Sequence, residues 1–462
     1  MPGTLSASDA FWQQPVTKQI QQQLGQFDPQ QQFVVACSGG RDSLSLACAL
    51  HLLCPGRVRI VHINHQLQAP AAQWASWLAG QCQQWQLPCM IQAVNVAAGN
   101  IEAEARKARY QALFGVLQNH EILVLGHHQQ DQAETIFLRL MSGSGVKGLS
   151  AMQTVEHRNT KRLWRPLLNS SRQQITELAT LLCPEYIDDP ANEQDNFDRV
   201  FLRQQVWPLL KNRWPSMDST LSRTALLMQD SQDILQEVLA QDWSQCGDAT
   251  LLNIAALELL SQSRQRLLLS RWMQGAEQYA PAFHLVEAVR HTLLDARQDA
   301  TPKIEWQGWQ FRRYQNQLYR LPKQLDTAQD VQVRWRCGQL LELPTGQWQW
   351  QQQQLGFPAQ LMQQLFSLRA RRGGEVIHVQ RRSGHWPLKK CLQEAKIAPW
   401  QRAQVHLCAV QDQLLGVFTP QGFWVNQQQV LIKDGWLPCL VSPTMTKTPT
   451  TIFKQEAAQD EK

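Results

Sequence analysis

The stretch Ser38-Gly39-Gly40-Arg41-Asp42-Ser43 decides how the first part of this chain folds. It follows the apolar run 33–37, which predicts a buried strand, and it precedes the run 44–53, which predicts a helix packed on one side. Such a turn can bind phosphate, because glycine lets the backbone come close and the start of a helix offers unpaired N–H groups. An ordinary turn between a strand and a helix is the alternative.

Two common nucleotide-binding motifs do not fit this stretch. A Walker loop requires a lysine before Ser or Thr, and a dinucleotide fingerprint requires Gly-x-Gly-x-x-Gly; neither pattern occurs here. Asp42 is unusual for an anion site, because a carboxylate repels phosphate. It fits if Mg²⁺ lies between the carboxylate and the phosphates, or if Asp42 caps the helix.

The composition excludes several classes of protein. The chain has 462 residues, 43% of them hydrophobic and 18% charged, which is typical of a globular protein with about two to four domains. No run approaches the ~20 apolar residues of a membrane helix, and residues 1–14 lack the pattern of a secretory signal. Eleven scattered cysteines without a Cys-x-x-Cys pair fit a reducing, cytoplasmic location, and the net charge of +6 permits a nucleic-acid partner.

Strand and helix patterns alternate after an amphipathic segment at 8–27. Short β-branched runs predict three further strands, at 58–63, 91–96 and 122–126. Helical patterns lie between and after them, at 71–85, 102–118 and 131–141. This order predicts an α/β fold with a mostly parallel sheet and helices on both faces. Ligands bind such sheets beyond the carboxyl ends of the strands, where polar clusters are expected at 38–43, 62–65 and 126–128.

The pattern changes near residue 215. Residues 218–298 lack strand signals and predict helices, notably 221–241 and 261–273. A hairpin of strands 306–311 and 317–321 follows, and 331–440 predict a small mixed or β-rich domain. We therefore expect a first domain at 1–215, a helical domain at 216–325, a small C-terminal domain at 326–440 and a disordered tail at 441–462.

Two carboxylates follow the third polar cluster. Asp131 and Glu134 are three residues apart, so on a helix they share one face. Opposite a phosphate loop they suggest Mg²⁺ coordination of a nucleotide. The alternative is that Asp131 caps the helix and Glu134 is solvated. The loop 142–145 is either a flexible segment beside a ligand or a plain linker.

Arginines 106 and 109 are also three residues apart on a predicted helix. They could contact a triphosphate or RNA. The alternative is an ordinary helix surface with intrahelical Glu–Arg pairs.

Together these motifs resemble the N-type ATP pyrophosphatases, in which a Ser-Gly-Gly-x-Asp-Ser loop after the first strand binds pyrophosphate. The fold implied is that of the adenine nucleotide alpha-hydrolases. Within this group the chain resembles the bacterial tRNA(Ile)-lysidine synthetases, whose motifs match in order over roughly residues 30–430. The matching segments are 62–65, 102–110, 127–135, 143–152, 165–168, 189–210, 369–375, 388–390 and 397–402.

The resemblance implies a ligase that modifies tRNA. ATP adenylates the carbonyl oxygen on carbon 2 of the wobble cytidine in the tRNA(Ile) with a CAU anticodon. The ε-amine of free L-lysine then displaces AMP and forms lysidine, which changes codon reading from AUG to AUA. ATP and Mg²⁺ are the implied cofactors, no membrane partner is implied, and a homodimer is compatible with the family.

The resemblance also implies the site residues. The catalytic set is Asp42, Asp131, Glu134 and Arg109, with Asp42 and Asp131 as Mg²⁺ ligands. The nucleotide-binding set is Ser38, Gly39, Gly40, Arg41, Asp42, Ser43, His62, His65 and His127. The tRNA-binding set is Arg199, Arg203, Arg369, Arg371, Arg372, Lys389 and Lys390. His65 and His127 are candidates for a base that neutralises lysine, against the alternative of buried structural histidines.

A basic cluster in the C-terminal part is interpreted as a tRNA surface. It carries seven positive charges against one acid, Glu375: Arg369, Arg371, Arg372, Arg381, Arg382, Lys389 and Lys390. Trp386 and Trp400 lie in and beside it and are candidates to stack on an unstacked base. A solvated surface without a partner is the alternative.

Several positions depart from the family's pattern, and two rival functions remain. Gln130 replaces the first of two adjacent aspartates, and Gln66, Gln68, Ser142 and Val200 replace a glycine, two arginines and an asparagine. These changes question how a second metal or the RNA backbone is held.

One rival function is a tRNA thiolation enzyme, which needs paired cysteines or a reactive cysteine near the loop, whereas Cys37 is expected inside the strand. The other is a catalytically decayed tRNA-binding protein, against which the retained carboxylates argue.

Overall fold

The computed structural model describes residues 8–66, 70–95, 101–158, 160–188, 198–277, 279–294, 302–326, 333–378, 386–411 and 413–442. Contacts divide the chain into two units, Met1–Val238 and Leu239–Lys462. The expectations for Gln68, Arg381, Arg382 and the tail beyond 442 lie outside the described residues. Within the described parts of the chain, no helix is long and apolar enough to cross a membrane.

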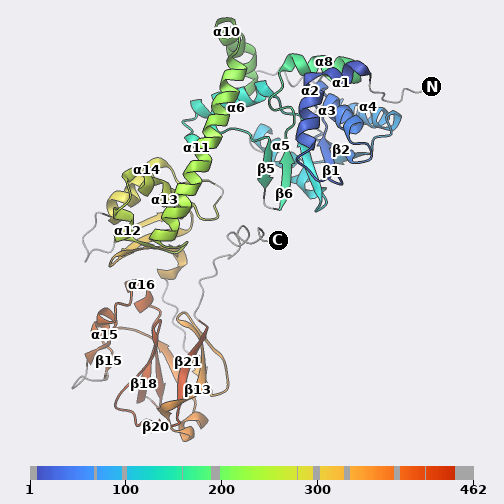
Figure 1. The fold of residues 1–462 in the computed structure, drawn as a ribbon. Helices are drawn as coiled ribbons and strands as arrows, with labels where there is room; N and C mark the ends of the chain where they lie inside the picture. Colours follow the sequence, from blue (N-terminus) through green and yellow to red (C-terminus); the bar gives the residue numbers. More distant parts are fainter. Residues whose placement is uncertain are drawn as a thin grey trace, which may run out of the picture. The chain divides into compact units, whose positions relative to one another are not determined.

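A six-stranded sheet in the order β3-β2-β1-β4-β6-β5 organises the first unit (Figure 1). Its strands are β1 Gln32–Ala36, β2 Val58–Asn64, β3 Cys89–Ala93, β4 Glu121–Leu125, β5 Val155–Arg158 and β6 Lys161–Trp164. All neighbouring strands run parallel except β5, which pairs antiparallel with β6. The predicted mostly parallel sheet is therefore confirmed. Sequence reasoning missed the β5–β6 hairpin, because charged residues interrupt its apolar pattern.

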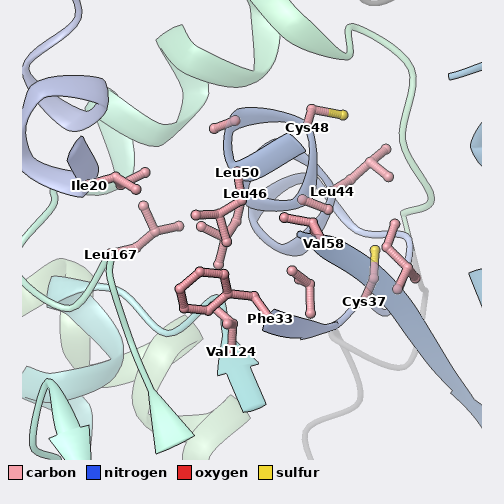
Figure 2. Close-up of a cluster of buried hydrophobic side chains, with 14 of the residues drawn as sticks. Ile20, Phe33, Cys37, Leu44, Leu46, Cys48, Leu50, Val58, Val124 and Leu167 are labelled. Atoms are coloured by element: carbon pink, nitrogen blue, oxygen red, sulfur yellow. The ribbon is translucent and has the colours of Figure 1, made fainter. Parts of the chain in front are cut away.

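Helices cover both faces of this sheet, as predicted. The helices of this part of the chain are α1 Asp9–Gln13, α2 Pro15–Leu24, α3 Arg41–Leu53, α4 Ala71–Gln84, α5 Ile101–Gly115, α6 Gln129–Met141, α7 Val146–Leu149 and α8 Arg172–Leu182. Because side chains alternate along a strand, Phe33 joins one core while its neighbour Val34 joins the other. Figure 2 shows the first core, where Phe33 lies among Leu46, Leu50 and Val124.

The expected helix at 8–27 is in fact two helices. Gln14 is extended and Pro15 begins α2. Proline disfavours a helical residue before it and has no N–H to donate, so α1 ends there. The strand expected at 91–96 begins earlier, at Cys89, because its register with β2 pairs Ile60 with Cys89.

A helical segment with one widened turn precedes a long helix. It consists of α9 Asp198–Phe201, the π turn Leu202–Val206 and α10 Trp207–Arg213, and the long helix α11 Met217–Cys246 follows. Pro208 has no N–H to donate to the carbonyl four residues earlier, and its ring crowds that carbonyl. The π turn lies directly before it, as expected for a helix that widens to relieve this conflict.

The second unit begins with helices on a small antiparallel sheet in the order β7-β10-β9-β8. Its elements are β7 Leu251–Asn253, α12 Ile254–Glu258, α13 Gln262–Gln274, α14 Phe283–Val289, the π turn Arg290–Leu294, β8 Lys303–Trp306, β9 Trp309–Tyr314 and β10 Gln317–Pro322. The predicted hairpin around Gln315 is confirmed. The strand expected at 306–311 is wrong in extent, because a turn at Gly308, with φ of 80°, separates β8 from β9. The expectation of no strand within 218–298 is also wrong, because β7 pairs with β10.

The last part of the second unit is β-rich, as predicted. One sheet has the order β11-β14-β17-β18-β19, and a second joins β12, β13, β20 and β21. Their bounds are β11 Val333–Trp335, β12 Leu341–Leu343, β13 Gly346–Phe357, β14 Phe366–Ala370, β17 His406–Val410, β18 Gln413–Thr419, β19 Gly422–Val425, β20 Ile432–Lys433 and β21 Trp436–Ser442. A two-stranded ribbon, β15 Val376–Ile377 and β16 Trp386–Pro387, leads into the short helices α15 Leu388–Glu394 and α16 Pro399–Arg402.

Candidate active site at the edge of the parallel sheet

The loop 38–43 connects β1 to α3 as predicted, and Ser43 holds its shape. The Ser43 hydroxyl accepts the backbone N–H of Ser38 at 3.1 Å and donates to the carbonyl of Gly40, also at 3.1 Å. Gly40 is the N-cap of α3, and Asp42 lies in the first turn. The alternative in which Asp42 caps the helix is therefore wrong, and its half-buried carboxylate is directed toward other partners.

A second glycine brings the end of β4 against this loop. A β-carbon added to Gly126 would lie 3.2 Å from Cα of Ser43 and 3.3 Å from the carbonyl oxygen of Asp42. These distances are tighter than ordinary contacts, so only glycine fits without a shift. The segment 126–131 consequently starts α6 directly beside the start of α3.

His128 lies between two predicted aspartates. Its Nδ1 accepts the backbone N–H groups of Gln130 and Asp131, and Asp131 accepts the backbone N–H of His128 in return. Since Nδ1 accepts, the ring carries its proton on Nε2. This Nε2 is 3.5 Å from Oδ2 of Asp42 and 3.6 Å from Oδ2 of Asp131. Asp131 and the loop residue Asp42 therefore share His128 as a partner. The N-cap of α6 is His128 itself, and Asp131 supports it as the second member of a capping box.

The side chains of Asp42, His128 and Asp131 influence one another's charge states. Burial alone would lower the pKa of His128, but the carboxylates of Asp42 and Asp131 raise it above its ordinary value. Burial alone would raise the pKa of Asp42, but His128 and Arg41 lower it overall. Sequence reasoning did not assign His128 a role. The spacing His-x-x-Asp before a helix has the form of a capping box and could have indicated this role in the sequence.

Glu134 is fully buried and held by three side chains, so the alternative in which it is solvated is wrong. Its two oxygens accept Nε2 of Gln130 at 2.9 Å, Nε of Arg199 at 2.9 Å, and both Nε and Nη2 of Arg203 at 2.9 and 2.8 Å. The same two arginines reach Oδ1 of Asp131, at 3.0 and 3.3 Å. Burial would raise the pKa of Glu134, but Arg203 and Arg199 hold it below its ordinary value.

Gln130, Arg199 and Arg203 surround the two carboxylates of α6. Gln130 stands where the family usually has an aspartate, and its amide donates to the buried Glu134. An aspartate at this position would instead place a third carboxylate beside two others. Arg199 and Arg203, assigned to tRNA, ion-pair here with Asp131 and Glu134; their tRNA role stays a prediction.

A cationic group lies around Tyr110 of α5. The guanidinium groups of Arg106, Arg109 and Arg158 are 5.3, 5.7 and 5.0 Å from the centre of the Tyr110 ring. Cations above an aromatic ring gain from its negative face, which helps three like charges to share this place. The tyrosine hydroxyl is buried and has no hydrogen-bond partner among the described residues. Such a gathering of positive charge suits an anionic ligand.

The histidines assigned to nucleotide binding are held neutral. Arg165 donates from Nε to Nδ1 of His127 at 3.2 Å, so the proton of His127 lies on Nε2. Burial, together with the charges of Arg165 and Arg109, holds the pKa of His127 well below its ordinary value. Burial and Arg109 likewise lower the pKa of His65. A histidine with a depressed pKa is a weak proton acceptor, which argues against either ring as the base.

Cys37 directly precedes the loop 38–43, and His62 of β2 contacts it. Nδ1 of His62 is 2.9 Å from the carbonyl oxygen of Cys37, so this nitrogen donates. Cys37 is buried, and burial raises the pKa of its thiol to about 11. At neutral pH it is a protonated, poorly reactive thiol. The thiolation enzyme that needs a reactive cysteine beside the loop is therefore disfavoured.

The donor set decides which residues suit Mg²⁺. This ion prefers carboxylate oxygens, completed by phosphates and water. Asp42 and Asp131 are the candidates, because their side chains are 29% and 15% exposed. Oδ1 of Asp131 already pairs with Arg199 and Arg203, so Asp42 is the better donor of the two. Glu134 does not fit, because its side chain is unexposed. No group of three His, Cys, Asp or Glu side chains in the described ranges could hold a metal, so phosphate oxygens must complete such a site.

The basic cluster of the second unit is built around Glu375. This largely buried carboxylate accepts the backbone N–H groups of Arg372 and Gly373, at 2.6 and 2.9 Å. Arg369 and Arg371 approach it at 3.3 and 3.7 Å. The structure thus brings Arg369, Arg371 and Arg372 to one turn.

The start of α15 is tied to the same turn. The backbone N–H of Leu388 donates to the carbonyl of Glu375 at 2.8 Å, and the exposed Lys389 and Lys390 follow.

Trp400 is not available to stack on a base. It is 4% exposed and its ring packs edge-on against Tyr319, with ring centres 4.9 Å apart, and against Tyr314 at 6.0 Å. The expectation that it contributes to the tRNA surface is therefore wrong. Its aromatic contacts instead join α16 to the β9–β10 hairpin.

Family models match the chain in three places. Residues 13–210 match a PP-loop domain, residues 252–319 a TilS substrate binding domain, and residues 366–434 a TilS substrate C-terminal domain. The first match contains the loop 38–43, His128, Asp131 and Glu134, and the third contains the turn around Glu375.

Curated relatives match over nearly the whole chain. A tRNA(Ile)-lysidine synthase from Acinetobacter baylyi is 43% identical over 448 residues, covering 96% of this chain and 98% of that protein. Those from Serratia proteamaculans and Escherichia coli O157:H7 are 36% and 34% identical, covering 88% and 86% of this chain and 96% and 94% of theirs. The resemblance seen in the motifs is confirmed. The chain belongs to the tRNA(Ile)-lysidine synthase family.

Proposed function

We propose that this chain is a ligase that uses ATP to join free L-lysine to the wobble cytidine of the tRNA(Ile) with a CAU anticodon, forming lysidine. The observation that carries the proposal is that His128 brings Asp131 close to Asp42 of the loop 38–43. A tRNA(Ile)-lysidine synthase matches this chain over 96% of its length, which supports the same function.

In the first step the loop 38–43 binds the β- and γ-phosphates of ATP. Its backbone N–H groups at the start of α3, with the hydroxyl of Ser38, offset the negative charge, while the Ser43 hydroxyl holds the shape of the loop. The carbonyl oxygen on carbon 2 of cytosine attacks the α-phosphorus. The bond from that phosphorus to the bridging oxygen breaks, and pyrophosphate leaves. Fixing the pyrophosphate keeps attack and departure in line.

Asp42 and Asp131 would hold Mg²⁺ beside these phosphates. A bound magnesium ion neutralises part of the charge that develops on the leaving pyrophosphate. His128 positions both carboxylates, because its Nε2 lies within 3.6 Å of each. Glu134 acts differently: it fixes Arg199 and Arg203 and through them Asp131, so we propose it as a positioning residue.

In the second step lysine attacks the activated base. The ε-amine nitrogen bonds to carbon 2, the bond from carbon 2 to the AMP oxygen breaks, and the amine loses a proton. The amine has an unperturbed pKa of ~10.4, so it must first be deprotonated. Burial of the amine or nearby positive charge would lower this pKa.

The finer assignments are supported by the same features. We propose that Arg369, Arg371, Arg372, Lys389 and Lys390 bind tRNA phosphates. The three matched segments lie within the proposed domains 1–215, 216–325 and 326–440. A homodimer and a cytoplasmic location stay predictions; light scattering of the full chain tests the first and cell fractionation the second.

One assay tests the function. The chain is incubated with ATP, radiolabelled lysine and the CAU-anticodon tRNA(Ile), and the tRNA is digested to nucleosides. Label in lysidine supports the proposal. Label that stays free, while the chain still binds this tRNA, supports the decayed tRNA-binding protein instead. The methionine tRNA, which shares the CAU anticodon, serves as the matched control substrate.

A further inference from the structure

A segment that carries no predicted role crosses the loop 38–43. After α8 ends at Leu182, the chain continues through Ile187, which is half-buried. The backbone N–H of Ile187 donates to the carbonyl oxygen of Gly39 at 3.0 Å. This bond joins residues 148 positions apart, and it lies at the centre of the loop proposed to bind pyrophosphate.

The side chain of Ile187 fills the space beside Gly39. A β-carbon added to Gly39 would lie 2.4 Å from Cδ1 and 3.3 Å from Cγ1 of Ile187. Gly39 also has φ of 85°, which other residues rarely adopt. A β-carbon added to Gly40 would lie 3.6 Å from the carbonyl oxygen of Ile187. Ile187 thus packs against both glycines of the loop.

The bond to Gly39 fixes the direction of the next N–H group. A trans peptide unit is planar, and its C=O and N–H point in opposite directions. Because Ile187 holds the carbonyl of Gly39, the N–H of Gly40 must point to the other side, where it donates to the Ser38 hydroxyl at 3.3 Å. If this peptide flipped, a carbonyl oxygen would face the bound anion, and glycine on both sides makes such a flip easy.

We propose that Ile187 is a positioning residue for the pyrophosphate loop. Its backbone N–H and its side chain hold the peptide between Gly39 and Gly40 so that the N–H of Gly40 points toward the Ser38 hydroxyl, on the side proposed to bind phosphate. This inference rests on the proposed function only in requiring that the loop binds the phosphates of ATP.

The test is a double-mutant cycle on the full chain, with Gly39→Ala, Ile187→Ala and both together. The probe is ATP in calorimetric titrations, with inorganic pyrophosphate as competitor and without tRNA or lysine. We expect about a tenfold weaker affinity for both ligands in Ile187→Ala, which is a change of about 1.4 kcal/mol. Gly39→Ala alone should weaken affinity by more than about 100-fold, because it adds the clash to the strained φ.

The double variant decides the matter. Removing Cδ1 and Cγ1 of Ile187 relieves the clash, so Gly39→Ala should cost less affinity in the Ile187→Ala background than in the wild type. Gly56→Ala is the matched control, because Gly56 has φ of 76° but nothing within 4 Å of the added carbon. It should combine additively with Ile187→Ala.

Three further readouts separate positioning from folding. Ile187→Val keeps Cγ1 and should restore affinity to within about twofold. In Ile187→Ala the affinity for tRNA and the thermal midpoint should stay close to the wild type. Additive effects in the cycle, or unchanged affinity for ATP and pyrophosphate in Ile187→Ala, would overturn the proposal. Because lysidine formation is not the readout, failure of the proposed function leaves these outcomes distinct.

Discussion

Glu134 and Glu375 are both carboxylates surrounded by arginines, yet they are built in opposite ways. The donors to Glu134 are all side chains, and its two arginines come from 65 and 69 residues away. The donors to Glu375 lie within six residues, and two of them are backbone N–H groups. Glu134 therefore joins α6 to the segment that carries α9 and the π turn, whereas Glu375 shapes a single turn. The first should control assembly of the site, and the second only the local presentation of charge.

The largest effect is expected at Glu134, which is fully buried. Glu134→Gln should lower the free energy of unfolding by about 3–5 kcal/mol, because Arg199 and Arg203 lose the charge that compensates them in a buried place. Lysidine formation should fall with it. Urea unfolding of the full chain measures the first and the label assay the second. Glu177→Gln on the exposed surface of α8 is the matched control and should change neither.

The next effect separates chemistry from assembly. Asp42→Asn should reduce tRNA-dependent release of pyrophosphate by about 100-fold or more, because the phosphates lose a charged ligand for their counter-ion. Its side chain is partly exposed, so unfolding should shift by less than about 1 kcal/mol. Normal pyrophosphate release in Asp42→Asn would refute the site. A loss of stability as large as that of Glu134→Gln would show that Asp42, like Glu134, is needed for assembly of the site.

A smaller, salt-dependent effect is expected at the turn of the second unit. Replacing Arg371 and Arg372 with Ala should weaken tRNA binding by about tenfold at ~0.1 M salt, because each lost phosphate contact also reduces the release of counter-ions. The difference from the wild type should shrink as salt rises, and ATP affinity should not change. Fluorescence anisotropy with labelled tRNA at several salt concentrations is the measurement. Equal affinity at all concentrations would show that this turn is only a solvated surface.

The smallest effect concerns pH. The folded-state pKa of His127 lies well below its ordinary value, so below about pH 6.5 the unfolded chain binds a proton that the folded chain does not. Stability should therefore fall as pH drops, by at most about 1.4 kcal/mol per pH unit from this residue. His127→Gln keeps an acceptor for Arg165 and should remove that part of the slope. Urea unfolding at pH 7 and pH 5.5 measures it, and identical slopes would contradict the neutral ring.

The parallel sheet and the loop 38–43 could be predicted because their signals are local. Strands buried on both faces are continuous apolar runs, and the glycine turn stands between one such run and a helix. The β5–β6 hairpin could not be predicted, because charged residues interrupt the alternation of apolar and polar residues along its strands. The partners of Glu134 and the role of Ile187 depend on contacts between distant segments, which one sequence does not contain.

The amide of Gln130 has a consequence for the number of metal ions. Asp131 and Glu134 carry two negative charges, and Arg199 and Arg203 carry two positive charges against them. With a neutral amide at position 130, the net charge of these four side chains is zero. With the aspartate usual in the family, the net charge would be −1, which would attract a further cation. The glutamine therefore leaves this group without excess charge, and of the two carboxylates proposed to hold magnesium only Asp42 lies outside the group.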